Sequence, residues 1–175
     1  SKFVGGLTFL PVTIEHGLEE ELAEFSHLRA LRSIPKLRFN KPNLTRTLLK
    51  ETFAFPQNYQ LSDKFKVCIF DGGLGSTHLL GDLAKEIIPA DVSASHPHFL
   101  AHGSEVCSTY LFGPYQPGSG LLGSPYTSVD VVRVLSPEDE HDPDLFNVLT
   151  RIEAVLKEKK YKYFSPNLFT DSIFC

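Results

Sequence analysis

The pattern of apolar and polar positions divides the chain into two parts. Residues 7–14 form an apolar run that a proline interrupts, which predicts an edge strand. Residues 17–32 carry apolar side chains at helical spacing, which predicts a helix, and the proline-containing basic residues 34–42 predict an extended segment. A polar stretch then separates a small N-terminal region, residues 1–60, from a larger part, residues 61–175.

The larger part alternates between strand-like and helix-like patterns. Residues 66–70 are mostly apolar, β-branched or aromatic and are followed by Asp71 and two glycines, which predicts a buried strand and a sharp turn. Residues 129–135 are nearly all β-branched, as in a strand buried on both faces of a parallel sheet. Residues 145–156 have helical spacing, and small residues predict another helix from His102 to before Gly113.

The remaining segments carry weaker patterns. Residues 79–85 are too short and glycine-containing for a helix, residues 87–95 predict a loop or a short strand, and residues 161–164 predict a last strand. The order strand, loop, helix, strand, helix, strand predicts an α/β fold with a parallel sheet. In such sheets the functional residues lie at the carboxyl ends of the strands.

Composition excludes two classes of partner. No apolar run of the 175-residue chain approaches the roughly 20 residues of a membrane span. The formal charge of -4, with scattered lysines and arginines, provides no basic surface for a nucleic acid. We therefore expect neither a membrane nor a nucleic acid as a partner.

The cysteines bear on the cellular compartment of the protein, and the lack of methionine bears on whether the chain is a fragment. The three cysteines form no paired motif, and two of them lie in segments predicted to be buried, which favours a reducing, cytoplasmic compartment. The chain contains no methionine, so its natural start is missing. We expect a processed chain or a fragment of a longer protein.

Asp71 and His102 are the candidate catalytic residues. A carboxylate at a strand end and an imidazole at a helix start meet above a sheet when the two elements are neighbours. The carboxylate then orients the imidazole and stabilises its protonated form during proton transfer. Taken singly, an aspartate in this position is more often a turn or capping residue, and a histidine before glycine is more often a local cap.

The combination resembles a known family. Residues 67–73 are similar to the aspartate motif of the subtilisin-like serine peptidases, and residues 102–108 are similar to their histidine motif. The resemblance covers residues 64–165 and implies part of a subtilisin-like doubly wound parallel sheet. It also implies that Asp71 orients the base and that His102 acts first as general base and then as general acid.

The family's nucleophilic serine motif and its oxyanion asparagine are missing from this sequence. Ser119 and Ser124 lie in a glycine-rich stretch after the predicted helix and match neither motif. We therefore expect the rest of the peptidase domain, with the serine, in a longer or separate chain, and this chain alone to be inactive. The alternative is a non-catalytic relative that binds a peptide or protein.

The resemblance also implies a substrate contact and a partner. In the family, the segment after the strand matched by residues 131–135 pairs with the substrate backbone. Here it contains Glu138, Asp139 and Glu140, which suggests a preference for basic substrates, with a solvated acidic loop as the alternative. Residues 23–38 resemble the region before the peptidase domain in cytoplasmic bacterial subtilases that work with an AAA-type ATPase, which implies such a partner.

Two other kinds of site remain open. His96, His98 and His102 with Asp71 are residue types that bind zinc, although a proline breaks their spacing. Residues 71–77 resemble the phosphate-binding turn of sugar kinases and actin-like ATPases, without the second motif of those proteins. The peptidase interpretation requires no cofactor and no metal.

Overall fold

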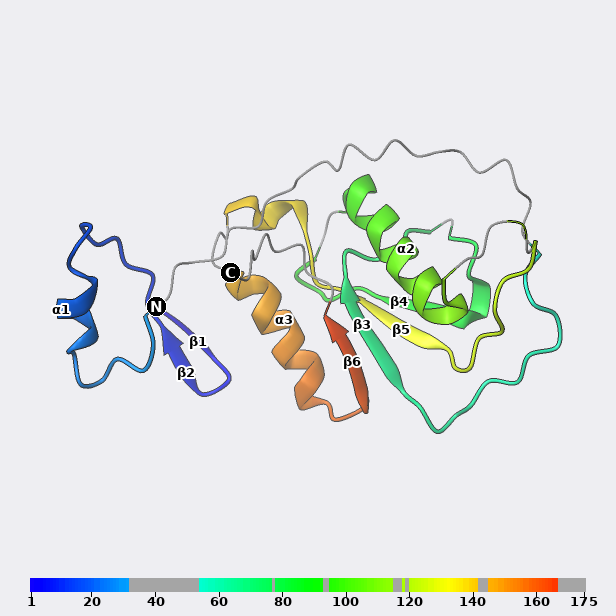
Figure 1. The fold of residues 1–175 in the computed structure, drawn as a ribbon, viewed down its shortest axis with the longest axis horizontal. Coiled ribbons are helices and arrows are strands. Elements are labelled where there is room, and N and C mark those ends of the chain that lie inside the picture. Colours follow the sequence, from blue (N-terminus) through cyan, green and yellow to red (C-terminus); the bar gives the residue numbers. More distant parts are fainter. Residues whose placement is uncertain are drawn as a thin grey trace.

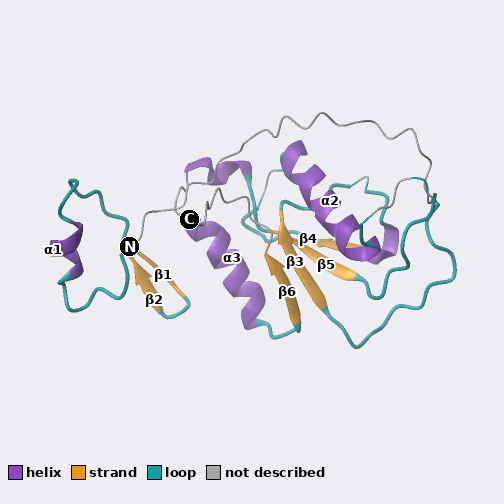
Figure 2. Ribbon diagram, in the orientation of Figure 1, coloured by secondary structure: helices purple, strands orange, loops and turns teal. Residues whose placement is uncertain are grey.

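The chain forms a hairpin, a short helix and an α/β domain (Figures 1 and 2). The structure is a computed structural model. The predicted extended segment at residues 34–42 lies outside the residues that it describes. The described residues are 1–31, 54–76, 78–92, 95–114, 118, 120–141 and 145–166.

The α/β domain is built on a four-stranded parallel sheet in the order β4-β5-β3-β6. This confirms the predicted α/β class and the parallel sheet. The strand β4 was not predicted, because its four residues include a lysine and a glutamate and show no clear apolar period. The strands are β3 (Val67–Asp71), β4 (Ala84–Ile87), β5 (Val129–Arg133) and β6 (Tyr163–Pro166).

The two long helices are α2 (Pro97–Phe112) and α3 (Phe146–Lys157). Helix α2 ends before Gly113, as predicted, but begins five residues before His102 and not at it. The cause is Pro97 in the first turn, with the His96 side chain accepting a hydrogen bond from the backbone N–H of His98 (3.2 Å). His102 therefore lies in the second turn of the helix.

The two helices cover opposite faces of the sheet. Cys107 and Leu111 of α2 share a core with Val67 and Ile69 of β3. Val148 of α3 shares a second core with the alternate β3 residues. Because successive strand side chains point to opposite faces, a run of fully buried residues in β3 is what a sheet covered on both sides requires. The β3 residues facing α3 are Cys68 and Phe70.

The two helical crossovers have opposite hand. The connection from β4 through α2 to β5 and the connection from β5 through α3 to β6 advance in the same direction across the sheet. Because α2 and α3 lie on opposite faces, one of the two crossovers must be left-handed. Left-handed crossovers between parallel strands are rare, at roughly 2% of cases.

The N-terminal residues form a hairpin of β1 (Lys2–Val4) and β2 (Leu7–Phe9), followed by α1 (Glu19–Ala23). The predicted strand is thus shorter, and the predicted helix is only five residues long and buries none of them. A helix this short gains little without packing. The hairpin contacts α3 through the Phe9 and Phe146 rings, whose centroids are 5.4 Å apart.

Candidate active site

The structure brings the predicted pair together. His102 Nδ1 lies 2.9 Å from Asp71 Oδ1, a hydrogen bond between side chains 31 residues apart in the sequence. Asp71 is the last residue of β3 and is fully buried, whereas the His102 side chain is 23% exposed. Because the carboxylate accepts, the imidazole proton lies on Nδ1 and the lone pair on Nε2.

Glycines at three positions allow α2 to approach the end of β3 this closely. A side chain at Gly103 would overlap the carbonyl of Gly73, and a side chain at Gly72 would overlap Phe99 of α2. Gly73 itself adopts a left-handed conformation, with φ +98°, in the turn after Asp71. The glycines beside both candidate residues therefore bring the helix backbone against the strand end.

The pair lies where the chain changes direction across the sheet. From β3, the chain proceeds to β4 and β5 on one side and then crosses to β6 on the other. In open α/β sheets, ligands bind outside the carboxyl ends of the strands at such a switch point. Asp71 occupies the carboxyl end of the strand at this point.

The two oxygens of the Asp71 carboxylate differ in their hydrogen bonding. Oδ1 accepts from both His102 and the Gly72 backbone N–H (2.6 Å). Oδ2 is buried without a hydrogen-bond partner among the described residues. Burial raises the pKa of Asp71 above its ordinary value, and the hydrogen bonds from His102 and Gly72 partly oppose this shift. The carboxylate can therefore accept one further hydrogen bond at Oδ2.

A largely buried ion pair supports the turn after Asp71, and the sequence did not indicate it. Glu86 Oε1 accepts from Arg133 Nη2 (2.6 Å) and from the backbone N–H of Leu74 (3.1 Å). Glu86 comes from the unpredicted strand β4, and Arg133 is the residue paired with Asp71 in the sheet register.

The acidic residues after β5 differ in their exposure to solvent. Glu138 is exposed, and the side chain of Glu140 lies outside the described part of the structure. Asp139 is 2% exposed, and its Oδ2 accepts from Arg151 Nη1 (2.7 Å) and from the Ser136 backbone N–H (2.8 Å). Asp139 therefore has a structural role instead of the substrate contact expected from the sequence.

Arg151 extends this structural role. Its Nη1 also donates to the carbonyl of Val134 (2.6 Å), and its Nε donates to Asp91 (2.8 Å). Arg151 thus joins α3 to the segments that follow β4 and β5. The sequence suggested only a helical residue at this position, because its contacts come from distant segments.

The alternative sites find less support. Among the described residues, no group of three or more histidine, cysteine, aspartate or glutamate side chains is arranged to hold a metal ion. In the turn after β3, the N–H of Gly72 bonds to Asp71 and that of Leu74 bonds to Glu86. These two groups are therefore not directed at a phosphate, as a phosphate-binding turn requires.

The buried cysteines are poor nucleophiles. Burial raises the pKa of both Cys68 and Cys107 to about 12. A thiol in this state carries almost no thiolate at neutral pH. Their place in the two cores agrees with the structural role predicted for them, and Cys175 lies outside the described residues.

Comparisons with known proteins give no relative. No protein-family model, curated protein or solved structure matches the chain. In the described part of the chain, no helix has the length and apolar character needed to cross a membrane.

Proposed function

We propose that Asp71 and His102 are the orienting acid and the general base of a subtilisin-like serine endopeptidase, whose serine lies outside this sequence. The observation that carries the proposal is the hydrogen bond between His102 Nδ1 and the buried carboxylate of Asp71. Its location at the switch point of a parallel sheet supports a catalytic role. So does the close glycine packing, because a reactive pair must be held rigidly.

The proposed mechanism is acyl transfer. Nε2 of His102 removes the proton from the serine hydroxyl as its oxygen bonds to the peptide carbonyl carbon, and the imidazolium is stabilised by Asp71. The same proton then passes to the leaving amine as the peptide C–N bond breaks. Water repeats the sequence on the acyl-enzyme, which releases the acid product and restores the serine.

The proposal extends to the setting of the enzyme. Residues 23–38 support a cytoplasmic protein that works with an AAA-type ATPase, although residues 32–38 lie outside the described residues. A preference for basic substrates now depends on Glu138 and Glu140 alone, since Asp139 is bonded within the fold.

The test is covalent labelling of the native material with a fluorophosphonate, followed by intact-mass analysis. A chain that completes the site should take the label, and His102→Ala and Asp71→Asn should each abolish labelling. His16→Ala is the matched control, because His16 is a fully exposed histidine in the N-terminal region and should leave labelling unchanged.

The rival is a peptide-binding protein without chemistry. Its supporting feature is the sequence itself, which lacks the serine motif. It predicts that peptide binds while no species in the native material takes the label. That outcome would contradict the endopeptidase proposal.

A further inference from the structure

Three ionisable side chains lie in a row across the carboxyl ends of neighbouring strands. They are Glu86 of β4, Arg133 of β5 and Asp71 of β3. The residues two positions earlier in these strands belong to the core beneath α2, so all three side chains point to that face of the sheet. Helix α2, which carries His102, covers the same face (Figure 1).

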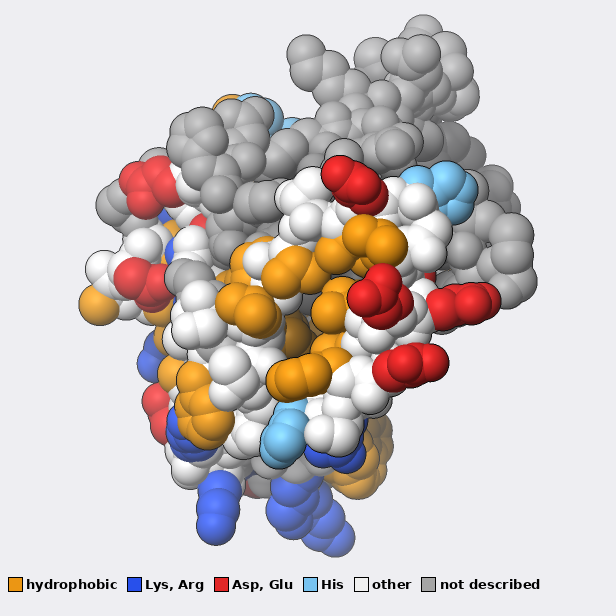
Figure 3. Space-filling model, turned by 90° about the vertical axis from the view of Figure 1, so that its left-hand side faces the viewer, with side chains coloured by type: hydrophobic (Ala, Val, Ile, Leu, Met, Phe, Trp, Pro, Cys, Tyr) orange, Lys and Arg blue, Asp and Glu red, His pale blue; other side chains and the backbone are white. Residues whose placement is uncertain are grey.

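Two of these charged side chains are withdrawn from water. Charged groups usually stay at the surface, and Figure 3 shows acidic and basic side chains on one face of the molecule. The Arg133 side chain is only 8% exposed and that of Glu86 only 14%. Glu86 Oε1 accepts from Arg133 Nη2 (2.6 Å) and Nε (3.0 Å). A buried ion pair adds little stability over apolar residues of the same volume, so stability alone does not account for it.

The ion pair lies against the turn that follows β3. A Cβ at Gly73 would overlap both Glu86 Oε1 and Arg133 Nε, so the paired groups are in contact with this residue. The carbonyl of Gly73 lies against α2, because a Cβ at Gly103 would overlap it. Gly73 therefore contacts both the ion pair and the helix residue next to His102.

Hydrogen bonds through Leu74 form a second path from the ion pair to the helix. The Leu74 backbone N–H donates to Glu86 Oε1 (3.1 Å). The carbonyl oxygen of Leu74 lies 3.2 Å from Ser104 Oγ, which also donates to the Leu100 carbonyl (2.8 Å). Ser104 is two residues after His102 in α2. The carboxylate of Glu86 is thus connected to the helix turn that carries His102.

We propose that Glu86 and Arg133 are positioning residues that hold His102 at hydrogen-bond distance from Asp71. Arg133 fixes the Glu86 carboxylate, and this carboxylate fixes the turn against which α2 packs. Both residues act through the turn and not on the reacting atoms. The inference concerns the hydrogen-bonded pair itself, and it extends to catalysis only through the proposed function.

The measure of position is the NMR resonance of the His102 Nδ1 proton, which reports the hydrogen bond to Asp71. Glu86→Ala removes the acceptor of the Leu74 N–H, and the resonance should disappear because the proton then exchanges with water. The double variant Glu86→Ala/Arg133→Met also removes the unpaired charge and should recover part of the stability, but the resonance should stay absent. Glu86→Gln keeps an acceptor oxygen and should retain the resonance.

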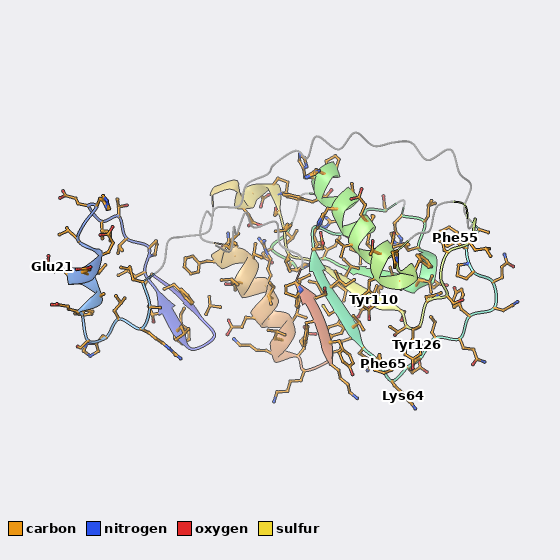
Figure 4. All side chains as sticks on the ribbon, in the orientation of Figure 1. Glu21, Phe55, Lys64, Phe65, Tyr110 and Tyr126 are labelled. Carbon is orange, nitrogen blue, oxygen red and sulfur yellow. The ribbon has the colours of Figure 1, made fainter. Side chains whose placement is uncertain are left out.

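Two controls separate positioning from stability. Asp139→Ala breaks another buried ion pair, with Arg151 of α3 on the other face of the sheet, and should lower stability while keeping the resonance. Phe65, Tyr110 and Tyr126 line a pocket of about 580 Å³ at the opposite end of the sheet, where β3 and β6 begin (Figure 4). Tyr126→Ala, at a residue 66% exposed, should keep the resonance as well.

Fluorophosphonate labelling of the native material measures the effect on the proposed chemistry. Glu86→Ala/Arg133→Met should slow labelling roughly tenfold or more, because a small displacement of a reacting group is this costly. Glu86→Gln should label at close to the wild-type rate. If the wild type takes no label, the proposed function fails, and the resonance by itself still decides the positioning role.

Three results would overturn the inference. One is a resonance that persists in folded Glu86→Ala/Arg133→Met. The second is an equal loss of the resonance in Asp139→Ala, which would mean that general destabilisation separates the pair. The third is a loss in Glu86→Gln as complete as in Glu86→Ala, which would mean that the acceptor oxygen does not position the turn.

Discussion

The two ends of the same parallel sheet are built in different ways. At the carboxyl ends of the strands, glycines bring backbone against backbone, next to a fully buried aspartate and a largely buried ion pair. At the amino ends, large aromatic rings stand partly in solvent and line a pocket, and lysines next to two of these rings in the sequence are exposed. At the carboxyl ends of the strands the charged side chains are mostly buried, whereas at the amino ends they are exposed.

This difference teaches where each kind of function is to be found. Proton transfer between defined atoms requires a fixed geometry, which close packing and buried hydrogen bonds provide. Binding of a partner requires accessible apolar area, which exposed rings provide. Substitutions at the two ends should therefore differ in their cost to stability.

Glu86→Ala should have the largest effect. It leaves Arg133 buried without its partner and the Leu74 N–H without an acceptor. We expect a loss of about 4 kcal/mol in the free energy of unfolding, measured by chemical denaturation. The double variant Glu86→Ala/Arg133→Met should recover part of this loss, since it also removes the unpaired charge. A loss as small as that of a surface substitution would contradict the buried-pair interpretation.

Gly103→Val should have the second largest effect on stability. The new side chain would overlap the Gly73 carbonyl and force α2 away from the end of β3. We expect a loss of about 3 kcal/mol and disappearance of the His102 Nδ1 proton resonance that reports its hydrogen bond to Asp71. Thr109→Val, at an exposed position of the same helix, is the control and should keep the resonance. Persistence of the resonance in Gly103→Val would show that the glycine contact does not position the pair.

Asp71→Asn should alter the pH dependence of stability. Because burial raises the pKa of Asp71, the stability it contributes is present below its unfolded pKa and is lost as pH rises through its folded pKa. The free energy of unfolding of the wild type, relative to the variant, should therefore fall from acid to neutral pH. Denaturation across a pH series measures this difference. A rise instead would mean that the hydrogen bonds to Asp71 outweigh its burial.

Lys160→Ala, near the amino end of the sheet, should have the smallest effect. Lys160 Nζ pairs with Asp130 (2.8 Å), and this contact raises the pKa of the lysine. The lysine side chain is 43% exposed, so solvent screens the pair and we expect a loss of about 0.5 kcal/mol. Thermal unfolding at low and high salt measures it. A loss comparable to that of Glu86→Ala would remove the contrast between the two ends.

Local signals in the sequence predicted much of the sheet and the candidate pair. The apolar run that becomes β3, the β-branched run that becomes β5 and the breaker at Gly113 each depend on neighbouring residues alone. Asp71 and His102 were predicted as a pair, and their side chains are found hydrogen-bonded. Their catalytic role stays a prediction.

Local signals failed where an element depends on its surroundings. The short strand β4 exists because it pairs with β5, and α1 stays short because it buries none of its residues against the described part of the chain. Asp139 was expected to face a substrate. It is instead buried and accepts a hydrogen bond from Arg151, twelve residues further on. No pattern within either segment reveals such a contact.

The sequence by itself therefore determined which residues form the main strands and helices, because hydrophobic period, β-branching and glycine act over a few residues. Only the tertiary structure decided the strand order, the opposite hands of the two crossovers, the Glu86 and Arg133 pair and the aromatic pocket. Each of these joins segments that are distant in the chain, so its free energy depends on how whole elements pack and not on the residues next to it.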